Sequence, residues 1–210
     1  LENMEHRGAV GSDPNTGDGA GILIQIPHDF FQKKMSALDM PLPAKKEYGV
    51  GMLFFPKHLE TRDECKRVVN ECIEKSGLTL IGYRLVPVDE SVPGHESKAV
   101  EPHIEQVFVT PNEKLTPEEL ERKLFVLGNY ATHEVGKNVD AENEQFYICS
   151  FSANTIVYKG QLKTDQVSRY FHDLRDPLFK SALATVHSRF STNTFPRWSL
   201  AQPFRVIAHN

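Results

Sequence analysis

The sequence predicts an α+β protein in which helices pack against layered sheets. Short apolar runs recur along the 210 residues, and this is the pattern of buried strands. Three longer segments instead repeat apolar residues at helical spacing. Strands and helices that are mixed in this way, without strict alternation, are typical of the α+β class.

The first part of the chain predicts a strand, a helix and a second strand. Residues 21–26 (GILIQI) form an apolar run of strand length, and residues 27–38 follow as a short helix opened by its proline. Pro41 and Pro43 mark a loop. Residues 47–56 (EYGVGMLFFP) show period-two features and predict the second strand.

A longer helix is expected from Thr61 to Gly77. Thr61 and Glu64 have the spacing of a capping box, and a glycine is a natural helix stop. Its apolar residues share one face, and they are Cys65, Val68, Val69, Cys72 and Ile73. Residues 78–88 (LTLIGYRLVPV) then predict another strand.

The middle of the chain predicts a loop, a strand and the most regular helix. Residues 89–102 are polar and contain prolines, which indicates a surface loop, whereas 103–110 (HIEQVFVT) predict a strand. The helix is expected to begin at Thr116, with Glu119 completing a capping box, and to end at Gly136. Its inward residues are Leu120, Leu124, Leu127, Ala131 and Val135.

The last third predicts a hairpin, a third helix and two terminal strands. Residues 146–152 (FYICSFS) and 155–162 (TIVYKGQL) are expected to pair as a hairpin across the two residues between them. Residues 164–174 repeat apolar positions at helical spacing. The apolar runs 183–186 and 204–208 predict the terminal strands.

Composition narrows the function classes. The chain is 40% hydrophobic and 25% charged, which is typical of a globular protein. A net charge of -4 with no basic cluster argues against a dedicated nucleic-acid binder. The apolar runs are well below the roughly 18 residues of a membrane span, so we expect no membrane partner.

The cysteines and histidines do not form a metal-binding pattern. Cys65, Cys72 and Cys149 lie within apolar segments and are expected to be small buried residues in a reducing compartment. The nine histidines form no i, i+4 pair with a carboxylate, and no CxxC motif occurs. We therefore expect no metal site.

The most informative residues follow the two terminal strands. The first strand leads into His187-Ser188-Arg189, and the second stops on His209-Asn210. An arginine can hold a carboxylate through two parallel charge-assisted bonds, and a side-chain amide can donate to an oxyanion. Taken by themselves, the favoured interpretations are a surface arginine for Arg189 and an ordinary turn residue for Asn210.

A glycine-rich segment, TGDGAG at 16–21, allows two interpretations. Exposed backbone amides in such a loop could bind a phosphate. However, the spacing does not match a P-loop, and a strand rather than a helix follows. A tight turn into the strand at 21–26 is the favoured interpretation.

Four segments of the chain resemble the glutamine-hydrolysing domain of the class II, N-terminal-nucleophile amidotransferases, of the type found in the large subunit of glutamate synthase. These segments are 2–31 (ENMEHRGAVGSDPNTGDGAGILIQIPHDFF), 146–162 (FYICSFSANTIVYKGQL), 179–204 (FKSALATVHSRFSTNTFPRWSLAQPF) and 205–210 (RVIAHN). The resemblance implies a four-layer α/β/β/α sandwich of the N-terminal-nucleophile hydrolase type. Residues 1–210 would form one partial amidotransferase domain, incomplete at both ends.

The resemblance also assigns residue roles. Arg189 falls on the arginine that holds the α-carboxylate of glutamine, and Thr192 and Phe190 would line the same site. Asn210 falls on the oxyanion-hole asparagine. Arg7 falls on an arginine near the nucleophile and would help to position it. The family uses the α-amino group of its nucleophile as the base, so the histidine before Asn210 is expected to be structural.

The nucleophile of the family is a cysteine that begins the mature protein, and position 1 here is Leu1. The chain is therefore expected to be an internal slice that is inactive alone. Its parent would hydrolyse the glutamine side-chain amide to glutamate and ammonia, with the ammonia channelled to 2-oxoglutarate amination.

The resemblance places the redox parts of such a protein elsewhere. No cofactor is expected in this segment, whereas FMN and an iron–sulfur cluster are expected in the rest of the parent. The implied partners are glutamine, the synthase domains of the same polypeptide and a small reductase subunit. The implied location is the cytoplasm, or the plastid in a plant.

Two other functions remain open. The chain could be a non-catalytic binding or scaffolding fragment, if the parent has lost its cysteine. It could also belong to a class II glutaminase that feeds another acceptor, such as a sugar phosphate. The long segment between DGAGI and FYICSFS, together with the wording HSRFSTNTFPRW, favours the glutamate synthase type.

Overall fold

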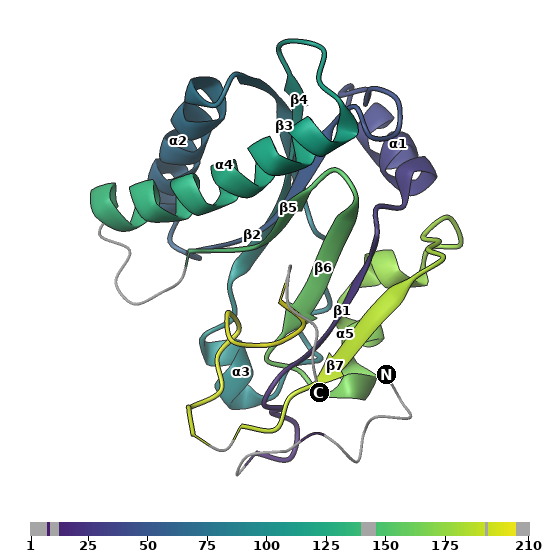
Figure 1. The fold of residues 1–210 in the computed structure, drawn as a ribbon. Helices are drawn as coiled ribbons and strands as arrows, with labels where there is room; N and C mark the ends of the chain where they lie inside the picture. Colours follow the sequence, from purple (N-terminus) through teal and green to yellow (C-terminus); the bar gives the residue numbers. More distant parts are fainter. Residues whose placement is uncertain (1–7, 9–12, 140–145, 192, 205–210) are drawn as a thin grey trace. The chain divides into compact units, whose positions relative to one another are not determined.

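The chain divides into two compact units in its computed structural model (Figure 1). The structure describes residues 8, 13–139, 146–191 and 193–204. Unit 1 comprises residues 1–25, 86–101 and 157–210, and unit 2 comprises residues 26–85 and 102–156. The described strands form a three-stranded sheet, β6-β1-β7, and a four-stranded sheet, β3-β4-β2-β5. The predicted α+β class is confirmed.

The four-stranded sheet belongs to unit 2. Its strands are β3 (Leu78–Leu85), β4 (His103–Pro111), β2 (Gly49–Phe55) and β5 (Tyr147–Ser152). β2 pairs antiparallel with β4 on one side and with β5 on the other, and all its residues are buried. The bounds predicted from the sequence for these four strands agree with the observed bounds to within a few residues.

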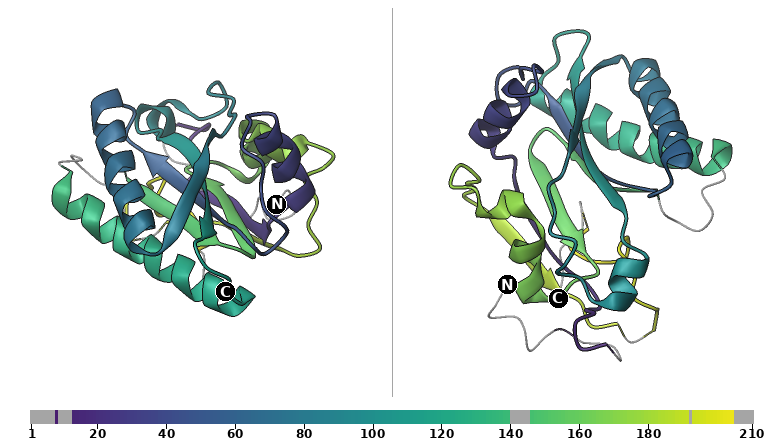
Figure 2. Two further views of the ribbon diagram at one scale, coloured as in Figure 1. Left: turned by 90° about the horizontal axis from the view of Figure 1, so that it is seen from above. Right: turned by 180° about the vertical axis from the view of Figure 1, so that it is seen from behind.

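Helices cover both faces of this sheet (Figures 1 and 2). The long helices α2 (Leu59–Lys75) and α4 (Pro117–Asn138) share a core with Leu53 and Val107, which lie on one face. On the other face, α1 (His28–Ser36) brings the Phe31 ring to 5.3 Å from the Phe108 ring. Because Val107 and Phe108 are adjacent in a strand, these contacts lie on opposite faces.

The ends of the two long helices differ in part from their predicted bounds. The predicted capping box of α2 is wrong: the cap is His58, whose Nδ1 accepts from the Thr61 N–H, and Glu64 instead binds Arg67. The predicted stop at Gly77, where φ is +68°, is confirmed. In α4 the Thr116–Glu119 capping box is confirmed.

The predicted end of α4 is wrong, because the helix continues through Gly136 to Asn138. A helix-interior glycine costs only about 1 kcal/mol. Burial of Val139 in the core, three residues later, favours continued helix more than this cost disfavours it, and the Val139 N–H donates to the Val135 carbonyl oxygen at 2.9 Å.

The predicted hairpin at 146–162 is wrong. β5 lies in the four-stranded sheet, whereas β6 (Thr155–Gly160) lies beside β1 in the three-stranded sheet. Side chains bind the turn between them: the Glu121 carboxylate accepts from the Ala153 N–H at 2.8 Å, and Ser152 Oγ accepts from the Thr155 N–H at 3.0 Å. These turn amides do not bond across a hairpin, so the chain passes from one sheet to the other.

Unit 1 contains the three-stranded sheet and short helices. Its remaining strands are β1 (Ala20–Gln25) and β7 (Ala184–Ser188), and its helices are α3 (His95–Ala99), α5 (Thr164–Tyr170) and the 3₁₀ helix η2 (His172–Arg175). The predicted loop 89–102 thus contains a helical turn. The predicted helix 164–174 is divided, because Phe171 forms an isolated bridge with Val88.

All three cysteines are buried, as expected, and none of them is in a disulfide. Burial raises the pKa of the Cys65 thiol to about 11 and also raises the pKa of Cys72. At neutral pH these two thiols are therefore protonated and weakly nucleophilic.

The second terminal strand predicted at 204–208 lies, except for Phe204, outside the described residues.

Candidate functional site

Arg189 directly follows β7 and is fixed beside the glycine-rich turn. β7 pairs antiparallel with β1, from Ala20 opposite Ser188 to Ile24 opposite Ala184. The Arg189 N–H donates to the Gly19 carbonyl oxygen at 2.8 Å, which extends this pairing by one residue. The backbone of Arg189 is thus set by the sheet, as the sequence predicted for an arginine at a strand end.

The guanidinium of Arg189 is held by the turn that follows it. Nη2 donates to Thr194 Oγ1 at 2.6 Å, and Nη1 donates to the Asp18 carbonyl oxygen at 3.4 Å. The side chain remains partly exposed. Both partners are neutral oxygens, so these contacts leave the positive charge available to an anion.

The first part of the turn is tied to Asp18. The Ser191 N–H donates to Asp18 Oδ2 at 2.6 Å, and the Ser191 hydroxyl donates to the Thr194 carbonyl oxygen. Asp18 is only 7% exposed. The backbone at Ser191 is therefore held close to Arg189, although the surrounding sequence is rich in small polar residues.

The later part of the turn is held by buried anchors. Trp198 is buried against the Tyr170 ring, with centroids 5.4 Å apart, and its Nε1 donates to the Ser97 carbonyl oxygen at 2.9 Å. Sequence reasoning did not assign Trp198 a role. It is the only tryptophan in the chain, and its place at the end of the HSRFSTNTFPRW motif was the available signal.

Lys159 is a second anchor that sequence reasoning missed. It is 1% exposed within β6, and its Nζ donates to the carbonyl oxygens of Ser199 at 2.9 Å and Ala201 at 2.7 Å. The Nζ also lies 4.9 Å from the centre of the Phe204 ring. A lysine inside the otherwise apolar run TIVYKG was the signal that could have revealed it.

The glycine-rich segment is a buried turn into a strand, as the sequence analysis favoured. Residues 16–20 are all buried, so the turn does not present the exposed amides of a phosphate-binding loop. A Cβ on Gly21 would lie 2.5 Å from Lys159 Cβ and 2.7 Å from the Gln202 carbonyl oxygen. A side chain at position 21 would therefore collide with Lys159 and with the chain at residue 202, which explains the glycine.

Of the five predicted site residues, the structure describes Arg189 and Phe190. Phe190 is 64% exposed and adjoins Arg189 in the turn. The other three, Arg7, Thr192 and Asn210, lie outside the described residues. Their assigned roles remain predictions.

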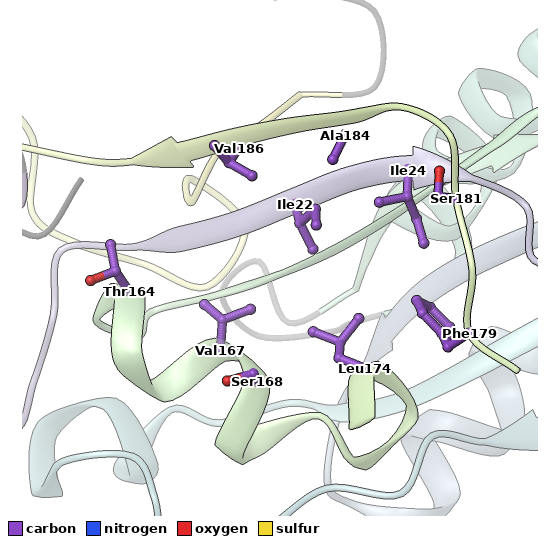
Figure 3. A pocket seen from close by; sticks show the side chains of 10 residues that line it. All are labelled: Ile22, Ile24, Thr164, Val167, Ser168, Leu174, Phe179, Ser181, Ala184 and Val186. Atoms are coloured by element: carbon purple, nitrogen blue, oxygen red, sulfur yellow. The ribbon is translucent and has the colours of Figure 1, made fainter. Parts of the chain in front are cut away.

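A cavity of about 510 Å³, lined by aliphatic and aromatic side chains together with three hydroxyl-bearing residues, lies elsewhere in unit 1, between the sheet and α5 (Figure 3). It is lined by Ile22, Ile24, Thr164, Val167, Ser168, Leu174, Phe179, Ser181, Ala184 and Val186. No charged side chain is in this set, so the cavity is unsuited to a zwitterionic amino acid. Ile22 faces the cavity, whereas Gly21 faces Lys159 and the chain at residue 202, so the cavity and residue 202 lie on opposite faces of β1.

The described part of the chain contains neither a cluster of metal-binding side chains nor a membrane-spanning helix. Within the described ranges, no group of three or more His, Cys, Asp or Glu side chains is placed to hold a metal ion. In the part of the chain that the structure describes, every helix is too short or too polar to cross a membrane.

Comparison with known proteins identifies relatives along the whole chain. The family described as "Glutamine amidotransferases class-II" matches residues 1–210. The chain is 40% identical over 210 residues to the ferredoxin-dependent glutamate synthase 2 of Synechocystis sp.. It is 44% identical over 212 residues to the NADPH glutamate synthase large chain of Bacillus subtilis, and 42% identical over 216 residues to the NADH glutamate synthase of Schizosaccharomyces pombe.

Each of these matches covers 100% of the chain but a small part of the relative. The chain spans 13% of the Synechocystis protein, 14% of the Bacillus protein and 10% of the Schizosaccharomyces protein. The matched region is therefore one segment of a much longer polypeptide in each relative.

Proposed function

Since this chain belongs to the class II glutamine amidotransferases, a glutamine-hydrolysing family, we propose that it is the glutaminase segment of a glutamate synthase. The membership agrees with the fold class implied by the resemblance. The three relatives bear the names of ferredoxin, NADPH and NADH enzymes, at identities between 40% and 44%. The chain is about equally similar to relatives named for three different electron donors. This suits a reaction step in which the electron donor takes no part.

The proposal depends on the hydrogen bonds that hold Arg189 in place. Its backbone is fixed by β1, its guanidinium is oriented by the neutral oxygens of Thr194 and Asp18, and it remains partly exposed. A planar fork that is held in one orientation binds a carboxylate with direction as well as charge. The α-carboxylate of glutamine is the group it would hold.

The other residue roles in the proposed reaction come from the sequence resemblance. A thiolate attacks the side-chain amide carbon, and Asn210 donates to the oxyanion of the tetrahedral intermediate. The C–N bond breaks and ammonia leaves, after which water cleaves the thioester and releases glutamate. Thr192 and Phe190 would line the glutamine site, and Arg7 would position the nucleophile.

The nucleophile in this proposal is the cysteine that begins the mature parent protein. The three cysteines of this chain are unsuitable, because all three are buried. The proton of the thiol would pass to the α-amino group of the same residue. A histidine base is therefore not required.

Residues 1–210 would form part of one amidotransferase domain, and the remaining parts of the reaction would lie elsewhere in the polypeptide. The synthase domains would use the ammonia to aminate 2-oxoglutarate. FMN and an iron–sulfur cluster would be bound there, and a small reductase subunit would be a further partner.

The full-length polypeptide that carries this segment should release ammonia from glutamine. Asparagine, which is one methylene shorter, is the matched substrate control and should react at least about tenfold more slowly. Ammonia release coupled to glutamate formation from 2-oxoglutarate supports the glutamate synthase assignment. Release without that product would indicate another class II glutaminase, and no release would favour a non-catalytic segment.

A further inference from the structure

Asp18 is a buried acidic residue for which the proposed reaction has no direct use. It lies in the middle of the glycine-rich segment and is 7% exposed. An acidic side chain close to an arginine that binds a carboxylate would, through its charge alone, weaken binding of the anion. The presence of Asp18 is therefore better explained by the parts of the chain that it holds in place than by its charge.

The contacts of Asp18 provide that explanation. Its carboxylate accepts from the Ser191 N–H at 2.6 Å, two residues after Arg189, and its carbonyl oxygen accepts from Arg189 Nη1 at 3.4 Å. The neighbouring Gly19 carbonyl oxygen accepts from the Arg189 N–H at 2.8 Å. This short segment thus holds the backbone before Arg189, the guanidinium itself and the backbone after it.

The effect continues to the other partner of the guanidinium. The hydroxyl of Ser191 donates to the carbonyl oxygen of Thr194, and the Thr194 hydroxyl accepts from Arg189 Nη2. Loss of the Asp18 carboxylate would leave the Ser191 N–H without its charge-assisted acceptor. The turn could then move, and the orientation of the Arg189 fork would move with it.

We propose that Asp18 is a positioning residue for the α-carboxylate of glutamine and acts through Arg189. This inference rests on the proposed glutaminase function. In this proposal Asp18 acts on the chain after Arg189, through the bond that its Oδ2 accepts from the Ser191 N–H, and not on the substrate directly. Its influence should therefore appear in substrate binding and should disappear once Arg189 is absent.

The test uses steady-state glutamine hydrolysis by the full-length polypeptide. Asp18→Ala should raise KM for glutamine by roughly tenfold, the loss of one charge-assisted bond, with kcat changed by less than about threefold. Asp18→Asn keeps an acceptor oxygen and should raise KM by only about threefold. In an Arg189→Ala background, neither substitution should raise KM further.

Asp173 provides a matched control for the loss of a buried acidic side chain in the same unit. It is 2% exposed, and its Oδ2 accepts from the Tyr158 hydroxyl at 2.8 Å. Asp173→Asn should lower thermal stability and leave KM unchanged. If Asp18→Ala fails to fold, Asp18→Asn with and without Arg189→Ala provides the same comparison.

The outcomes separate this inference from the function on which it rests. An active wild type with unchanged KM in both Asp18 variants would overturn the inference alone. A KM increase that is equally large in the Arg189→Ala background would also overturn it, because the effect would then not pass through Arg189. A wild type that neither hydrolyses glutamine nor binds glutamate in calorimetry would overturn the proposed function itself.

Discussion

Replacing Arg189 with alanine should lower kcat/KM for glutamine by about 10²–10³, mainly through KM, because the substrate carboxylate loses a charged partner worth about 3–4 kcal/mol. Arg189→Lys should recover only part of this loss. It restores the positive charge, but an ammonium lacks the planar fork that the Thr194 and Asp18 oxygens orient. Initial rates of ammonia release across a range of glutamine concentrations measure both parameters.

Arg169 is the matched control for this substitution. It is an exposed arginine of α5 in the same unit, and its Nη1 lies 3.6 Å from the Asp165 carboxylate. Arg169→Ala should change kcat/KM by less than about twofold, as expected for an exposed ion pair away from the site. An equal loss in both variants would show that the Arg189 effect is not specific.

Replacing Lys159 with methionine should free the segment that follows the turn. The carbonyl oxygens of Ser199 and Ala201 would lose their donor in a buried place, while the apolar replacement keeps much of the side-chain volume. We expect the free energy of local opening of this segment to fall by about 2–3 kcal/mol. The fall is a net value, because the variant no longer has to bury an ammonium group. The amides of Leu200 and Ala201, which donate to the Arg197 carbonyl oxygen, report on this segment.

Hydrogen exchange of the full-length polypeptide, measured by mass spectrometry, checks this prediction. Peptides covering 199–202 should exchange roughly 30- to 150-fold faster in Lys159→Met. Lys98→Met is the matched control, since Lys98 also donates to a backbone carbonyl oxygen, that of Glu90 at 2.8 Å, but is exposed. Unchanged exchange in Lys159→Met would show that the buried lysine does not hold this segment.

The features that the sequence predicted correctly depend on neighbours close along the chain. The capping box at Thr116 joins residues three apart, and the stop at Gly77 depends on one residue with φ of +68°. Arg189 was expected at the end of a strand because an apolar run leads directly into it, and β7 ends at Ser188. Such signals can be read without knowledge of the tertiary structure.

The features that the sequence did not predict depend on distant partners. The hairpin expected at 146–162 was wrong because Glu121, from α4, binds the turn and the two strands enter different sheets. An alternating pattern predicts a strand but does not specify its neighbour. The roles of Asp18 and Lys159 likewise depend on contacts with residues 191, 199 and 201, which lie 173, 40 and 42 positions away in the chain.

The most direct test of the account compares glutamine with 4-aminobutanamide, which lacks only the α-carboxylate, in the wild-type full-length polypeptide and in Arg189→Ala. If Arg189 holds the carboxylate, kcat/KM in the wild type should favour glutamine by about 10²–10³, and Arg189→Ala should remove most of that preference. The same preference in both proteins would contradict the account, because the carboxylate would then be recognised elsewhere.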